Sequence, residues 1–268
     1  MKAFAIVVAV VLITTSLFAG SASAQPADAG RPQLHVNNAY STCFFDLHPE
    51  LTPADFEEFA RQLGPIMRFR QLGDTTPLRP GKVDLSLQYT ATPIDDTKNA
   101  WNNTMSHPSA DHYLGDAIVL PRVVARFGVS DRVDVGAWGT IAPHSNYGII
   151  GADTTVALVR QGPSRPVSVS IRPSASALLG PASVWGANAS VDVTVGHAFR
   201  YLSPYLGGAL SSSVAIDRRP ASVKLDPATA NGAVAYAGVS YGWRALRLSA
   251  EVEDGAMFSY GFRIGTRF

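Results

Sequence analysis

Three residues near the middle of the chain have the types needed for nucleophilic catalysis. His144 stands beside Ser145, and Asp153 follows across an expected hairpin, so the three could serve as base, nucleophile and orienting carboxylate. All three types are also common in loops, and nothing in the sequence fixes their mutual geometry. No catalytic residue is therefore assigned, and a hydrolase remains an alternative function.

A second group could bind a divalent metal. His107, Asp111, His112 and Asp116 lie within one polar segment, and imidazole and carboxylate groups are common metal ligands. Their spacing is not that of a recognised metal site, which favours an exposed surface loop. No glycine-rich phosphate-binding loop joins a strand to a helix. The sequence thus predicts neither a metal nor another cofactor.

A larger set of polar and charged residues recurs at alternate positions of the chain, opposite apolar residues. Such alternation predicts that these side chains line one common interior. Because both signs of charge are present, salt bridges could close a narrow interior; the alternative is a narrow hydrophilic pore that selects ions or small solutes. The predicted interior residues are Asp84, Gln88, Arg122, Arg126, Asp134, Asp153, Arg172, Asn188, Asp192, Arg247, Glu251, Glu253, Arg263 and Arg267.

The elements that would position these side chains are strands. From Lys82 onward apolar and polar residues alternate with period two, as in Val83, Leu85 and Leu87. Strands are predicted to begin near 83, 117 and 132 and to occupy about 149–160, 166–178, 185–197, 203–214, 231–243, 246–253 and 258–268. The predicted fold is all-β, an antiparallel up-and-down transmembrane barrel of about ten strands, with eight to twelve compatible with the pattern.

The connections between these strands alternate in length. The short ones are 128–131, 161–165, 198–202 and 244–245, and the longer or more polar ones are 93–116, 143–148, 179–184, 215–230 and 254–257. Short turns on one rim and long loops on the other are typical of membrane-spanning barrels. An even number of strands would return the carboxyl terminus to the short-turn rim.

The amino-terminal region has the features of an export signal. Lys2 precedes an uncharged apolar run that ends near Phe18, and small residues lead to a cleavage site after Ala24. We expect residues 1–24 to be a cleaved signal peptide. The remaining chain has 21 acidic and 21 basic residues, since Lys2 is one of the 22 in the whole sequence, which disfavours nucleic acid as a partner. The single cysteine, Cys43, excludes an intramolecular disulfide and is interpreted as a partly buried, unreactive residue.

Residues 25–80 form a separate amino-terminal segment with one predicted helix, about 52–63. Thr52 can cap the helix, Pro53 suits its first position, and Gly64 is expected to end it. The apolar face of this helix comprises Phe56, Phe59, Ala60 and Leu63. We expect the segment to be periplasmic or plug-like, packed at the periplasmic mouth of the barrel or within it. A docking site for a periplasmic partner is the alternative. The barrel itself is assigned to residues 81–268.

The last strand decides which face of the barrel meets lipid. One face carries Phe258, Tyr260, Phe262, Ile264 and Phe268, while Ser259, Gly261, Arg263, Gly265 and Arg267 form the other. In a small soluble barrel the aromatic residues would have to crowd the interior. If the faces are reversed, the aromatic residues contact lipid and the arginines enter a polar lumen.

This terminal segment, which ends on an aromatic residue, resembles the carboxyl-terminal assembly signal of bacterial outer-membrane β-barrel proteins. The resemblance covers the signal peptide, the alternating strands and the last strand, and it identifies no subfamily. It implies an outer-membrane location, with outer-membrane lipid, the barrel-assembly machinery and periplasmic chaperones as partners of a monomer. The function would be that of a structural or surface protein or of a narrow pore. A soluble exported barrel that binds an apolar ligand is a further alternative.

Aromatic residues are also expected to form a belt at each membrane interface. Those near the short-turn rim are Phe127, Phe199, Tyr201, Trp243 and Phe268; those toward the other rim are Trp101, Tyr113, Trp138, Tyr147 and Trp185.

Overall fold

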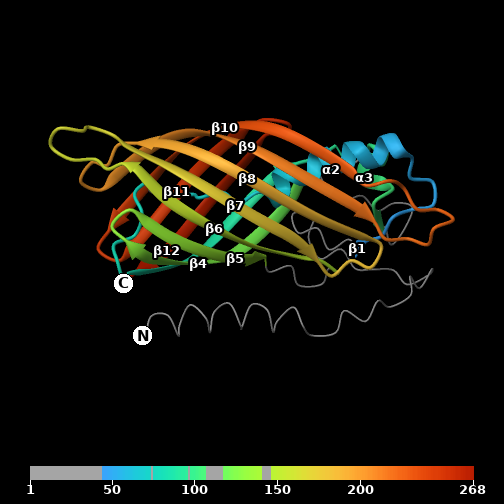
Figure 1. The fold of residues 1–268 in the computed structure, drawn as a ribbon, viewed down its shortest axis with the longest axis horizontal. Helices are drawn as coiled ribbons and strands as arrows, with labels where there is room; N and C mark the ends of the chain where they lie inside the picture. The colour runs from blue at the N-terminus through green and yellow to red at the C-terminus, as the bar shows by residue number, and fades with distance from the viewer. Residues whose placement is uncertain (1–43, 74, 96, 107–116, 141–145) are drawn as a thin grey trace.

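A computed structural model describes residues 44–73, 75–95, 97–106, 117–140 and 146–268. Ten antiparallel strands form a closed barrel (Figure 1), which confirms the predicted fold class and strand number. In the order in which they pair around the barrel, they are β10 (Ala228–Trp243), β11 (Leu246–Asp254), β12 (Ser259–Arg267), β2 (Val83–Pro93), β4 (Ala117–Ser130), β5 (Val133–Thr140), β6 (Gly148–Val159), β7 (Ser168–Leu179), β8 (Val184–Gly196) and β9 (Leu202–Asp217).

Pairing of the last strand with the first closes the barrel. In the register of β12 and β2, Ile264 lies opposite Leu87, and Arg263 lies opposite Gln88. The strand order given above starts at β10 and ends at β9, and these two strands also pair, so every barrel strand has two neighbours. Closure therefore leaves no open sheet edge.

Inward and outward side chains alternate along the strands of this barrel. In β12, Phe262 is 54% exposed, whereas Arg263 is 7% exposed. Leu87, opposite Ile264 on the neighbouring strand, is likewise exposed, and Gln88, opposite Arg263, is buried. The apolar row is therefore on the outside of the barrel, and the charged row is on the inside.

Three short elements accompany the main helix at one end of the barrel. The helix α2 spans Pro53–Met67, α3 spans Asn99–Asn102, and β1 (Phe44–Phe45) pairs with β3 (Met105–Ser106). Neither helix of the described chain has the length and apolarity needed to span a membrane.

The start of α2 follows the sequence prediction. The Thr52 hydroxyl accepts a hydrogen bond from the Asp55 backbone N–H at 3.2 Å, and Pro53 occupies the first turn. The predicted end at Gly64 is wrong, because the helix continues through Pro65 to Met67. Ile66 and Met67 are buried inside the barrel, so packing of this last turn outweighs the poor helical preferences of glycine and proline.

The described residues between 44 and 80 enter the barrel at one end and reach the other, with one side of α2 open to solvent (Figure 1). We call residues 44–67 the mouth segment and residues 68–80 the lumen segment. The mouth segment lies at the long-loop rim: for example, the Leu47 N–H donates to Ser183, in the loop before β8. The lumen segment then runs to the short-turn rim, where β2 begins (Figure 1). The helix is thus within the barrel and toward the mouth opposite the one expected.

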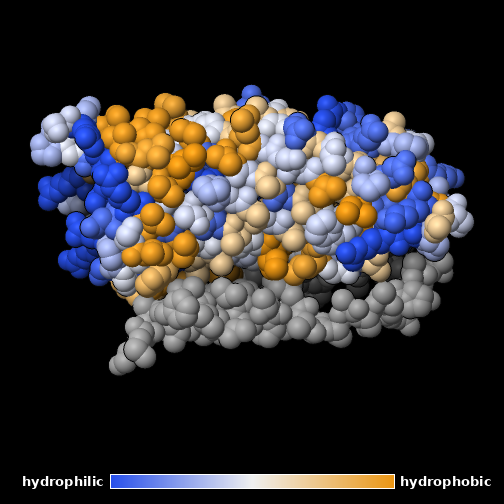
Figure 2. Space-filling view, viewed as in Figure 1, coloured by the Kyte–Doolittle hydropathy of each residue, from blue (hydrophilic) through white to orange (hydrophobic). Residues whose placement is uncertain are grey.

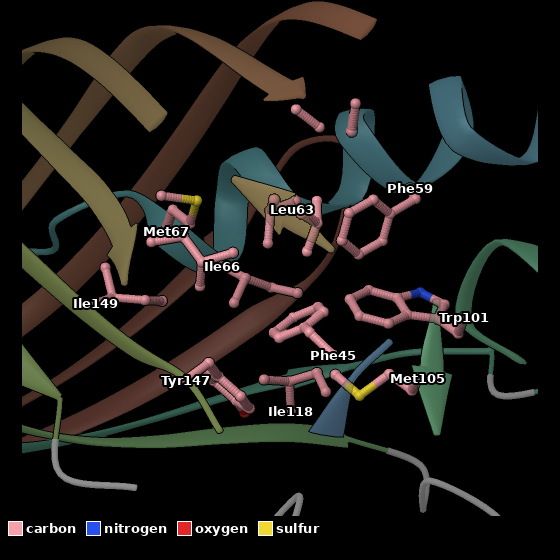
Figure 3. Packing of buried hydrophobic residues seen from close by; sticks show 14 of the residues in the cluster. Phe45, Phe59, Leu63, Ile66, Met67, Trp101, Met105, Ile118, Tyr147 and Ile149 are labelled. Carbon is pink, nitrogen blue, oxygen red and sulfur yellow. The ribbon is translucent and has the colours of Figure 1, made fainter. Parts of the chain in front are cut away.

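The apolar core of the protein lies inside this long-loop mouth (Figure 3). Phe59 of α2 meets Trp101 edge-on, with 5.5 Å between ring centroids, and Phe45 packs against Tyr147 at 4.7 Å. Leu63, Ile66 and Met67 continue the cluster deeper into the barrel.

This core corrects part of the predicted aromatic belts. Trp101, Trp138 and Tyr147 are buried within the barrel, because the mouth and lumen segments supply apolar partners there. Trp185 is half-buried, and Tyr113 lies outside the described residues. At the short-turn rim Phe127 is half-buried, and Phe199, Tyr201, Trp243 and Phe268 are exposed.

Candidate functional site

The candidate site is the occupied lumen of the barrel. Among the predicted interior residues, Arg247 and Arg267 are half-buried near the short-turn rim. The others are buried in the barrel wall: Asp84, Gln88, Arg122, Arg126, Asp134, Asp153, Arg172, Asn188, Asp192, Glu251, Glu253 and Arg263.

One ion-pair cluster lies within the wall itself. Arg126 of β4 binds Asp134 of β5 and Asp153 of β6, with 2.7 Å between its Nη1 and Asp153 Oδ2. It also donates to Thr155 Oγ1 at 2.7 Å. Gly136 lies between them, and a Cβ at that position would be 2.5 Å from Asp153 Oδ1. Because Gly136 has no side chain, Arg126 of β4 can reach Asp153 of β6 across β5.

A second cluster joins the lumen segment to the wall. The Arg68 guanidinium bridges Asp192 of β8 and Glu253 of β11. Asp192 also binds Arg172 at 3.3 Å, and Glu253 also binds Arg70 at 3.3 Å. Three guanidinium groups thus share two carboxylates, and Arg68 connects strands on different sides of the barrel.

A third cluster lies toward the short-turn rim. Asp84 of β2 accepts from Arg263 and from Arg267 of β12, the latter at 3.3 Å. Arg263 also donates to the Leu72 carbonyl at 3.3 Å. The same arginine therefore pairs with the wall and holds the lumen segment.

Arg122 binds the backbone of residues 66–68 instead of a carboxylate. Its guanidinium donates to the carbonyls of Ile66 at 2.7 Å and Arg68 at 3.0 Å. It also lies over the Trp138 ring, 4.6 Å from the centroid, in cation–π geometry. Arg122 therefore fixes the point at which α2 ends and the lumen segment begins.

Further hydrogen bonds from the wall follow the segment along the lumen. Ser176 donates to the Met67 carbonyl at 2.9 Å, and the Leu78 N–H donates to Asp134 Oδ2 at 2.8 Å. Thr75 and Ser168 also share a hydrogen bond. Contacts at both ends and in the middle give the segment one register relative to the wall.

Aromatic residues of the inner wall lie against glycines of neighbouring strands. Tyr205 is opposite Gly238, and Tyr236 is opposite Gly207. A Cβ at Gly207 would be 2.5 Å from the Tyr236 ring, so a larger residue would displace it. The Tyr205 hydroxyl donates to Glu251 Oε2 at 2.9 Å. These glycines therefore accommodate rings that the sequence reasoning did not place in the lumen.

Two arginines of the site were missed by sequence reasoning. Arg68 and Arg70 lie beyond the predicted strands, in a segment with no clear periodicity. The available signal was their alternation with Met67 and Phe69, which are buried as well. Charges next to such apolar residues indicate a segment with paired charges inside the protein.

Most of the candidate catalytic and metal-binding residues lie outside the described part of the chain. These are His144, Ser145, His107, Asp111, His112 and Asp116, and Cys43 and residues 1–24 lie outside it as well. Asp153 is buried in β6, where Arg126 occupies its carboxylate.

Electrostatic interactions at the mouth are weaker and more exposed. Partial burial raises the pKa of Glu58 in α2, but hydrogen bonds from Gln62 and Arg61 and the charges of Arg61 and Lys98 lower it more. The net result is a pKa below the ordinary value of 4.5. This carboxylate is therefore charged at neutral pH, on the solvent side of the helix.

No protein-family model and no curated protein sequence matches the chain. Among solved structures, it is similar to Ail of Yersinia pestis in complex with sucrose octasulfate (11% identity; 70% of this chain and 99% of that chain; TM-score 0.32). It is also similar to the outer-membrane protease OmpT of Escherichia coli (6%; 72% and 98%; TM-score 0.36) and to the KdgM porin (9%; 69% and 98%; TM-score 0.33). The neighbours are outer-membrane barrels.

Proposed function

We propose that this chain is an outer-membrane β-barrel protein whose lumen is closed by its own lumen segment, and that it serves as a structural or surface protein. One observation carries the proposal. The strands of a closed barrel expose apolar side chains outside and bury paired charges inside, and those charges hold the chain segment that fills the lumen.

The outer surface supports a lipid environment. Figure 2 shows apolar residues gathered along the side of the barrel and hydrophilic residues gathered at both ends. Leu210 is 70% exposed, and Leu206, Val252 and Ile264 are exposed as well. In water each such side chain forgoes up to about 1.5–3 kcal/mol of burial free energy. In a bilayer the same residues meet acyl chains, and closure satisfies the backbone groups of the strands.

The interior supports a closed barrel over an open pore. Arg68 and Arg122 make contacts with both the wall and the backbone of the segment, and both are fully buried. An ion crossing the lumen would have to displace this segment and leave buried charges unpaired, which costs several kcal/mol. We therefore place conduction second to a closed structural role.

The proposal extends to partners and location. Outer-membrane lipid would contact the apolar belt, and the barrel-assembly machinery and periplasmic chaperones would handle the unfolded chain through its terminal strand. The short-turn rim would face the periplasm. Since the barrel has no open edge, it does not require a second copy, and a monomer suffices.

The first experiment is electrophoresis of the detergent-extracted protein with and without boiling, because folded membrane barrels resist detergent unfolding until they are heated. We expect two different mobilities. Equal mobilities, together with release of the protein from cells without detergent, would favour the soluble apolar-ligand binder and contradict the proposal.

The second experiment separates a closed barrel from a pore. The purified protein is added to planar lipid bilayers, and the current is recorded with an open porin as positive control. We expect no steady conductance. Steady channels of uniform size would replace the closed structural role with the narrow pore. Hydrolysis of lipid or peptide that is lost in His144→Ala would instead favour the hydrolase.

A further inference from the structure

A cavity of about 440 Å³ lies at the short-turn mouth, beneath the end of the lumen segment. Its walls come from distant parts of the chain: residues 76–79, the start of β2, the turn after β6, the start of β11 and the end of β12. The strands that contribute lie on different sides of the barrel, so the cavity spans the mouth. Its volume is in the usual range for sites that bind small molecules.

The charged side chains that line this cavity are all basic. They are Arg79, Lys82, Arg160, Arg247 and Arg267. Arg160 and Arg267 each have an acidic partner. Asp84 accepts from Arg267 at 3.3 Å, and Asp131 is 4.0 Å from Arg160 at an exposed position, where an ion pair contributes little.

Two of these cations have no partner within the described part of the chain. Arg79 and Lys82 are exposed, and neither takes part in an ion pair or side-chain hydrogen bond there. Arg160 and Arg247 approach the same space from the turn after β6 and from β11. A concave site with this excess of positive charge attracts anions from solution or from a membrane surface.

We propose that this cavity binds an anionic molecule that carries one or two phosphate groups. Guanidinium groups match the oxygens of phosphate with paired hydrogen bonds, and Lys82 adds a point charge. Pro77 and Leu78 also line the cavity, and their apolar side chains suit an organic portion of the ligand. The site depends on residues 76–79 of the lumen segment, and it adds a binding role to the structural role proposed above.

The phosphate could belong to a soluble compound or to an anionic lipid headgroup, and the test separates the two. The full-length protein in uncharged detergent is titrated with inorganic pyrophosphate by calorimetry. Native mass spectrometry then compares adducts of phosphatidylglycerol with adducts of phosphatidylcholine. The test variant is Arg79→Gln/Lys82→Gln, and the matched control is Arg132→Gln/Arg200→Gln, which removes two exposed cations from the same rim but outside the cavity.

We expect the test variant to weaken binding by about tenfold or more, and the control to change it by less than about threefold, since rim charges outside the site act only through screened interactions. Loss of pyrophosphate binding in the test variant alone supports a soluble ligand. Loss of phosphatidylglycerol adducts alone supports a headgroup. Absence of both kinds of binding in the unmodified protein, or equal losses in the two variants, overturns the proposal. Heat-modifiable migration of each variant checks that it is folded.

Discussion

In the mouth segment, residues 44–67, contacts with the barrel are mainly apolar, whereas in the lumen segment, residues 68–80, they are dominated by guanidinium and carboxylate groups. Phe59 and Leu63 pack against other buried apolar side chains, and the free energy of apolar burial does not depend on the direction of a contact. Arg68 must meet two carboxylates at once. Apolar burial thus stabilises the inserted chain, and the ion pairs determine its position.

The largest effect on stability is expected from a large-to-small substitution in the apolar core of the mouth segment. Phe59→Ala removes a fully buried ring that contacts Phe45, Phe56 and Trp101. The free energy of unfolding should fall by about 3–5 kcal/mol, through lost burial and a residual cavity. Urea titration of the protein in detergent micelles measures this change. Val223→Ala, in an exposed loop, is the control, and an equally small effect in both variants would show that α2 does not contribute to the core.

The next effect tests the charged region. Arg68→Met leaves Asp192 with Arg172 and Glu253 with Arg70. The free energy of unfolding should therefore fall by about 3 kcal/mol, near the lower end of the range for a broken buried ion pair. Transient current steps in planar bilayers should appear as the lumen segment loosens. The control is Arg61→Ala, an exposed partner of Glu58, with an expected loss below about 0.5 kcal/mol. Equal losses in the two variants would refute the role assigned to Arg68.

A smaller effect is expected at Gly64, near the carboxyl-terminal end of α2 in the mouth segment. A Cβ added at Gly64 would be 2.8 Å from Ser213 Oγ, so Gly64→Ala should cost about 1–3 kcal/mol by overpacking, despite the better helical preference of alanine. Ser213→Gly should restore part of the loss in a double-mutant cycle. Additive effects of the two substitutions would mean that the helix does not approach β9 this closely.

The smallest effect is a pH dependence at the solvent side of α2. Because the pKa of Glu58 is below 4.5 in the folded protein, its carboxylate adds stability above that pH, and the contribution is lost as the pH falls through the folded pKa. We expect less than about 0.5 kcal/mol, since the group is partly exposed. Urea titrations at several acidic pH values should show this component in the unmodified protein and not in Glu58→Gln. Its persistence in the variant would assign it to other carboxylates.

The sequence predicts the barrel strands well because their alternation is local. Even so, β9 extends to Asp217 and β10 starts at Ala228, beyond the predicted bounds. Cross-strand pairs such as Ala215 with Ala228 lengthen both strands, and the alternation within either segment alone does not predict this.

The pairing inside the lumen could not be predicted in the same way. Arg68 meets partners 124 and 185 positions away, and its own segment has no regular period. Trp138 lies on the charged, inward face of its strand. The sequence assigns it to an interfacial belt because it is aromatic and near a rim, but its partners in the structure are Phe69 and Arg122. Local patterns show which face a residue occupies, whereas partner choice depends on the packed interior.

The most direct test of the account is the environment of its outer face in lipid vesicles. Nitroxide labels are placed at Leu206→Cys and Leu210→Cys, with Val223→Cys as a loop control and Cys43 replaced by Ser in each. Collision rates with oxygen, which concentrates in lipid, and with a water-soluble nickel complex are then measured. For a lipid-facing surface we expect frequent collisions with oxygen and few with nickel at positions 206 and 210. Nickel collisions there as frequent as at position 223 would contradict a lipid-facing barrel.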